Sequence, residues 1–171
     1  MRRYLIPTLL VVLVLTSGIL AGCGQASSTS SLKTYTNYAY GYSIRHPSSW
    51  KVDESGETVL IYRSFNAYIS IGTLGGQQLT AEDLEWLVEN MVEELRIGTD
   101  DFLLISKRQL YDMDTPALEI TYTGKTNEGL SFKAKCRCII YRDRLYVVTI
   151  VSPGAEIPSE ILAALNSFSF Q

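Results

Sequence analysis

One stretch says most about the fold of this chain: Tyr40-Gly41-Tyr42-Ser43-Ile44-Arg45-His46-Pro47-Ser48-Ser49-Trp50. Gly41 allows a backbone bend with positive φ, where a side chain would clash. Residues 42–46 predict a short strand, and Pro47 ends it because proline lacks the N–H that a β-ladder needs. Trp50 then offers a large apolar surface that can close one end of a core. All of these expected roles are structural.

Further strands are predicted outward from this stretch, because apolar runs and alternating residues are bounded there by turn residues. They are 58–63, 67–74, 103–111, 117–123, 130–141 and 145–151, with turns at 64–66, 112–116 and 142–144. In the strand 117–123, Leu118, Ile120 and Tyr122 alternate with Glu119 and Thr121, which predicts one buried face.

Two helices are expected among these strands. Thr80 and Asp83 form a near capping box, and Gly98 ends the first helix. Its apolar residues recur at helical spacing, at Leu84, Leu87, Val88, Met91, Val92 and Leu95. Residues 158–166 predict a short second helix. The expected class is therefore α+β, with a mostly antiparallel sheet.

The opening stretch resembles the "Tyr-Gly-Phe-Ser-Ile … Tyr-Pro-x-x-Trp" opening of PsbP-like domains. The order that follows is also similar, ending with a helix before Ser167-Phe168-Ser169-Phe170, so the resemblance covers residues 35–171. It implies an α/β/α sandwich with a central antiparallel sheet flanked by helices, a fold shared with a Ran-binding nuclear import factor and several bacterial lipoproteins. The resemblance also implies a non-enzymatic binding or assembly module.

The N-terminus has the features of a bacterial lipoprotein signal peptide over residues 1–22. Arg2 and Arg3 precede an apolar run from Leu5 to Leu20, which contains a proline and is short for a membrane span of about 20 residues. Leu20-Ala21-Gly22-Cys23 matches a lipobox, which predicts cleavage before Cys23 and a lipid on its thiol. The alternatives are an ordinary signal peptide and an uncleaved anchor.

Residues 23–34 are expected to be the lipidated cysteine and a flexible tether, because serine and glycine are frequent there. A two-chain lipid anchor holds a protein stably at a membrane. The sequence therefore predicts an extracytoplasmic protein on the bacterial cell membrane. Gly24 is not the aspartate that suggests inner-membrane retention, so outer-membrane sorting is allowed if the organism has that membrane.

Composition excludes several functional classes. The chain has 171 residues with 15 Lys+Arg against 18 Asp+Glu, a net charge of −3, which argues against nucleic-acid binding through counterion release. There is one histidine, His46; a triad with Asp53 can be drawn, but no nucleophile lies in a recognisable catalytic setting. The prediction is a protein that is not an enzyme and has no cofactor or metal site.

Cys136 and Cys138 alternate with Lys135 and Arg137, so both thiols are expected to point into the core. Buried free thiols are favoured over a strained disulfide and over a metal or redox site. A second cysteine pair or a nearby histidine would be needed to complete four-coordination, and the sequence offers neither.

A basic stripe is the candidate interaction surface, formed by Lys133, Lys135, Arg137, Arg142 and Arg144. It could meet anionic headgroups, a cell-wall polymer or an acidic protein partner. The alternative is a strand face kept soluble by charge. The leading functional hypothesis is a binding module, and the second is a carrier or sensor with a small apolar ligand or lipid in a cavity lined by residues such as Trp86 and Met91.

Overall fold

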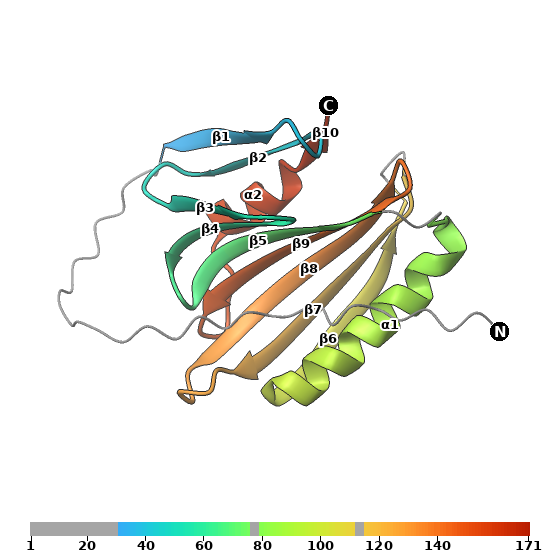
Figure 1. Ribbon diagram of the computed structural model, residues 1–171. Coiled ribbons are helices and arrows are strands. Elements are labelled where there is room, and N and C mark those ends of the chain that lie inside the picture. Colours follow the sequence, from blue (N-terminus) through green and yellow to red (C-terminus); the bar gives the residue numbers. More distant parts are fainter. Residues whose placement is uncertain (1–30, 76–78, 112–114) are drawn as a thin grey trace.

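The computed structural model describes residues 31–75, 79–111 and 115–171, which form two sheets and two helices (Figure 1). In chain order the elements are β1 (Leu32–Asn37), β2 (Tyr42–Pro47), β3 (Lys51–Ser55), β4 (Thr58–Ser64), β5 (Ala67–Leu74), α1 (Ala81–Gly98), β6 (Asp100–Leu110), β7 (Ala117–Lys125), β8 (Ser131–Tyr141), β9 (Arg144–Pro153), α2 (Ser159–Asn166) and β10 (Ser169–Phe170). The predicted strands and both predicted helices are present, and the α+β class is confirmed.

The larger sheet has seven strands in the order β3-β4-β5-β9-β8-β7-β6, and the smaller has three in the order β1-β2-β10. All of these strand pairs are antiparallel. Strand β5 pairs with β9, so β8, β7 and β6 extend the sheet on one side of β9 while β5, β4 and β3 extend it on the other.

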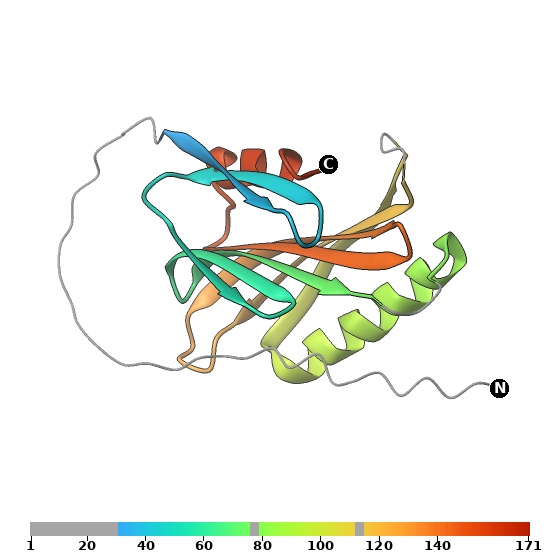
Figure 2. The same ribbon diagram turned by 45° about the horizontal axis from the view of Figure 1, so that its top comes forward.

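The two faces of the large sheet are covered by different elements (Figure 2). Helix α1 packs against β6, β7 and β8 on one face. On the opposite face, α2 packs against β2 and β9, and the small sheet lies beside it. We call these the α1 face and the α2 face.

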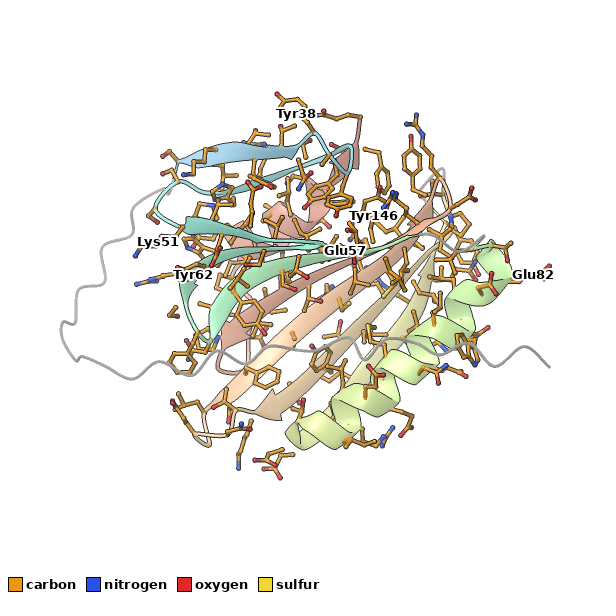
Figure 3. The ribbon with its side chains drawn as sticks, viewed as in Figure 1. Tyr38, Lys51, Glu57, Tyr62, Glu82 and Tyr146 are labelled. Atoms are coloured by element: carbon orange, nitrogen blue, oxygen red, sulfur yellow. The ribbon has the colours of Figure 1, made fainter. Side chains whose placement is uncertain are left out.

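The core on the α2 face is built around the opening stretch of the sequence. Tyr42 and Ile44 are fully buried there, and Trp50 is buried with them. Gly41 has a φ of +65°, the conformation that its lack of a side chain favours. Tyr146 projects from β9 toward this turn, and its hydroxyl donates a hydrogen bond of 2.9 Å to the Tyr40 carbonyl (Figure 3). The structural roles predicted for this stretch are confirmed.

The core on the α1 face lies under one side of the helix. Leu84, Val88 and Val92 are buried against β7 and β8. The Thr80 backbone N–H donates to the Asp83 carboxylate at 2.7 Å, which caps the helix as predicted.

The folded part starts earlier than predicted. Strand β1 begins at Leu32, so residues 32–34 belong to a strand and not to a tether, because β1 pairs with β2 in continuous register from Leu32 opposite Pro47 to Asn37 opposite Tyr42. Strands β3 and β10 were not predicted either. Residues 1–30, with Cys23, and 112–114, in a predicted turn, lie outside the described residues. Among those described, no helix has the length and apolar character needed to cross a bilayer.

Candidate binding site around Glu119

Glu119 lies at the centre of a charged cluster on the α2 face. It is on β7, and its direct neighbours in register are Arg108 on β6 and Arg137 on β8. Residues directly opposite each other on antiparallel strands project to the same face, so the register alone sets a guanidinium on each side of the carboxylate.

Three cations contact this one carboxylate. Arg108 donates to Oε1 from Nε at 3.0 Å and from Nη2 at 2.8 Å. Arg137 donates to Oε2 from Nη2 at 2.8 Å and from Nε at 3.3 Å. The Lys135 Nζ lies 3.2 Å from Oε1. One negative charge therefore meets three positive charges, a local surplus of two.

The cluster is largely withdrawn from water. The Glu119 side chain is 2% exposed, Arg137 11%, Lys135 23% and Arg108 61%. Burial alone would raise the pKa of Glu119, but the hydrogen bonds from Arg137, Arg108 and Lys135 outweigh it, so the pKa lies below the ordinary value of 4.5. Glu119 is therefore ionised at neutral pH.

Arg137 also joins the cluster to the end of α2. Its guanidinium lies 3.1 Å from the Asn166 Oδ1 and 3.4 Å from the Leu165 carbonyl oxygen. A cation at the C-terminus of a helix interacts favourably with the helix dipole and with carbonyls that lack helical partners. Arg137 thus holds α2 in place over the sheet as well as neutralising Glu119.

A pocket of about 170 Å³ opens next to the cluster. The pocket is lined by the ammonium groups of two lysines, one hydroxyl, one carboxylate and two apolar side chains. These belong to Lys133, Lys135, Thr121, Glu156, Ile157 and Leu162. The Lys133 Nζ is 3.7 Å from the Glu156 carboxylate, a long and solvent-exposed contact. Leu103 on edge strand β6 is an exposed apolar residue near the pocket. It pairs with Thr123, and Thr123 lies on the α2 face together with Thr121, so Leu103 is also on the α2 face. The pocket can therefore accept an anionic group with an apolar neighbour.

Solved structures share this arrangement of elements. Cyanobacterial PsbP (CyanoP) from Synechocystis sp. PCC 6803 superposes with a TM-score of 0.60 at 16% identity, over 90% of this chain and 100% of that one. The fold is PsbP-like. The Saccharomyces cerevisiae Ran-binding protein Mog1p matches with a TM-score of 0.55 at 12% identity, over 83% of this chain and 96% of that one. A Bacteroides thetaiotaomicron protein matches with a TM-score of 0.57 at 12% identity, over 81% of this chain and 48% of that one.

No family model and no curated protein matches the sequence. At these identities the structural matches establish the PsbP-like fold and nothing about ligands or partners. The functional argument therefore depends on the residues of this chain.

The fold does not gather the five predicted surface residues in one place. Lys133, Lys135 and Arg137 lie together on the α2 face, but they are mostly buried and paired with carboxylates. Arg142 and Arg144 lie at the β8–β9 turn, at the other end of β8 from Lys133, where their guanidinium carbons stand 5.0 Å and 5.6 Å from the ring centres of Tyr141 and Tyr40. That the five bind a partner stays a prediction.

Sequence reasoning missed Glu119 and Arg108. The alternation in 117–123 predicted one buried face, and that face is buried. The opposite face, with Glu119 and Thr121, is buried as well, because the cations of β6 and β8 enclose the Glu119 carboxylate. The only signal in the sequence was a glutamate within a strand, next in the chain to strands rich in Lys and Arg.

His46 has a structural position in the fold. Its side chain is 1% exposed, and its Nδ1 lies 3.0 Å from the Pro47 carbonyl oxygen. Burial lowers its pKa below the ordinary value of 6.5. A ring enclosed in this way does not face a substrate.

The prediction that Cys136 and Cys138 point into the core is confirmed. Both are buried free thiols, with their Sγ atoms 3.9 Å apart. Within residues 31–75, 79–111 and 115–171, no three His, Cys, Asp or Glu side chains are grouped as metal ligands.

The two residues suggested for a carrier cavity differ in position. Trp86 is 47% exposed, on the outer side of α1. The Met91 Sδ is 4.0 Å from the Cys138 Sγ, in contact with the sheet. The exposed position of Trp86 does not favour the carrier hypothesis, whereas Met91 lies between the helix and the sheet, where such a cavity was expected.

Proposed function

We propose that this chain is a lipid-anchored, extracytoplasmic, non-catalytic binding module of the PsbP-like type. Its binding surface is the part of the α2 face that includes the Glu119 cluster, the adjoining pocket and the exposed Leu103. The fold class supports the module, and the partner is a protein that presents a carboxylate side chain beside an apolar one. The anchor is a lipid on Cys23, after removal of residues 1–22.

The observation that carries this proposal is the surplus of positive charge around Glu119. Two of the three cations that contact Glu119 are less than a quarter exposed, and Lys133 stands beside them with only a 3.7 Å contact to Glu156. Cations removed from water are stabilised by further anions, since screening is weak there. An acidic side chain in the pocket supplies that charge, and Ile157 and Leu162 contact the apolar part of the partner.

The experiment places a photo-crosslinking residue at Leu103 in the lipidated protein and uses native membranes. We expect one crosslinked protein, identified by mass spectrometry, with a yield that falls as salt is raised. Lys133→Glu reverses a charge at the pocket and should reduce the yield severalfold. Lys51→Glu makes the same charge change on β3, near Tyr62 at the far edge of the sheet, and should leave the yield unchanged (Figure 3).

Equal losses from the two substitutions would overturn the assignment of the surface. A crosslink to polysaccharide would change the partner class. A small molecule that co-purifies without crosslinking would favour the carrier hypothesis. Mass spectrometry of the same preparation reads the modification of Cys23, and an unmodified thiol would contradict the predicted anchor and localisation.

A further inference from the structure

Three sulfur atoms meet beneath α1. The Sγ atoms of Cys136 and Cys138 are 3.9 Å apart on β8, and the Met91 Sδ from α1 is 4.0 Å from the Cys138 Sγ. The whole chain contains 3 cysteines and 3 methionines, so half of its sulfur-containing residues meet at this point. The sulfur cluster, as we call these three residues, lies on the α1 face, opposite the Glu119 cluster.

The spacing suits an ion held between the sulfurs. A metal–thiolate bond is about 2.3 Å long. An ion at that distance from both atoms of either measured pair would make a sulfur–metal–sulfur angle of about 120°, the angle of trigonal coordination. Two of the three sulfur pairs therefore already have the separation that an ion bound between them requires.

We propose that Cys136, Cys138 and Met91 bind one soft monovalent metal ion of the copper(I) class. Thiolate and thioether ligands select such ions over calcium or magnesium. On binding, two S–H bonds break, two metal–thiolate bonds form and the two protons leave to solvent, while the thioether donates a lone pair. The oxidation state of the metal does not change, and the loaded site has a net charge of −1. This proposal is independent of the proposed function.

Zinc is a poorer candidate because structural zinc sites have four ligands. The sequence argument against a metal site was that no histidine or second cysteine pair completes such a set. Met91, 47 residues before Cys138 in the chain, supplies a third ligand instead, and three suffice for a soft monovalent ion.

The surroundings combine a rigid base with an adjustable ligand. Strand β8 is held between β7 and β9 along its length, so the two thiols keep their separation. Met91 lies on the helix, and its unbranched side chain can reposition the thioether by rotation. Both thiols are at most 2% exposed, so the ion enters when α1 opens locally, and the closed helix then slows its release.

The test uses the full chain with Cys23→Ser, which removes the third thiol, titrated without oxygen with copper(I) against a coloured copper(I) chelator. We expect one ion per chain held against the chelator, with an ultraviolet thiolate-to-copper band. Cys136→Ala with Cys138→Ala should abolish retention. Met91→Leu, close in volume, should weaken binding about tenfold or more. The reverse change outside the cluster, Leu95→Met, should have no effect.

Two results would overturn the proposal: failure of the Cys23→Ser chain to hold copper(I), or unchanged affinity in Met91→Leu. Thermal unfolding checks that each variant is folded. A measurement that needs no further variant is X-ray absorption of the loaded chain, where we expect three sulfurs at about 2.3 Å from copper. Two sulfurs alone would contradict the role of Met91.

Discussion

The two faces of the large sheet differ most where they share strand β8. On the α1 face this strand presents Cys136 and Cys138, which are sealed under an amphipathic helix. On the α2 face the intervening residues, Lys135 and Arg137, contact a buried carboxylate. Neighbouring residues of β8 therefore lie in two different environments, because successive side chains of a strand point to opposite faces of the sheet.

The comparison shows two ways to bury a sheet. The α1 face uses apolar contact and keeps its charges at the rim, where Lys107 reaches Glu85 and Glu89 at 3.1 Å each. The α2 face is apolar beneath the small sheet but charged at β6–β8, where three cations contact the buried Glu119 carboxylate. A buried ion pair is costly when one partner is lost, whereas an exposed pair contributes little. The predictions below test this difference.

The largest expected effect comes from Glu119→Gln, which keeps the side chain's size and removes its charge. Arg108, Lys135 and Arg137 then repel one another without a counterion, so the free energy of unfolding should fall by about 4 kcal/mol in urea denaturation. The control, Glu85→Gln, makes the same change at the rim of the α1 face and should cost less than about 0.5 kcal/mol. Similar losses in both variants would contradict the comparison.

Leu84→Ala tests the apolar packing of the α1 face. Leu84 is on the buried side of α1 and is 3% exposed. Its truncation leaves a cavity between the helix and the sheet, so the free energy of unfolding should fall by about 3 kcal/mol. Leu84→Met nearly conserves the volume and should cost less than about 1.5 kcal/mol. Equal costs would mean that packing at this position does not hold the helix.

Acid should weaken the side of the small sheet and α2 in two separate steps. The folded pKa of His46 is lowered, so as pH falls below about 6.5 the unfolded chain takes up a proton before the folded one does, and stability declines. The slope is at most about 1.4 kcal/mol per pH unit. Urea denaturation between pH 8 and pH 5 measures it, and His46→Gln should flatten the profile there.

The second step belongs to Glu119. Its folded pKa is also lowered, so its contribution is present above about pH 4.5 and is lost as pH falls from there. Glu119→Gln should remove this lower step and leave the upper one in place. A profile in which His46→Gln changes the lower step would contradict these assignments.

Apart from the control substitutions, the smallest effect is expected from Lys107→Ala. Its ammonium contacts two carboxylates on α1, but both are mostly exposed, so the loss should be below about 1 kcal/mol and should shrink further in high salt. A loss as large as that of Glu119→Gln would mean that the rim of the α1 face is as strongly coupled as the buried cluster.

Much of the fold was predictable because its signals are local. The alternation of Cys136 and Cys138 with Lys135 and Arg137 assigned these side chains to opposite faces correctly, since a strand has a period of two. The spacing in 84–95 identified the buried side of α1. Strands β3 and β10 were missed because β3 has four polar residues out of five and β10 has two residues in all.

The candidate site was less predictable because it depends on register. Glu119 meets Arg108, 11 residues earlier, and Arg137, 18 residues later, and a shift of one residue in either pairing would move the guanidinium to the other face. No local pattern in 117–123 carries that information, so Glu119 was not identified as a buried charge.

By itself, the sequence determined the order and type of most elements and the direction of the two thiols, and it predicts a lipoprotein signal peptide before Cys23. These depend on neighbours within a few residues, where backbone geometry is uniform. Tertiary structure alone decided that Glu119 would be enclosed by three cations and that Met91 would reach Cys138 across 47 residues. Such contacts form only in the complete fold, because strand register and helix packing are both fixed by the burial of the apolar core as a whole.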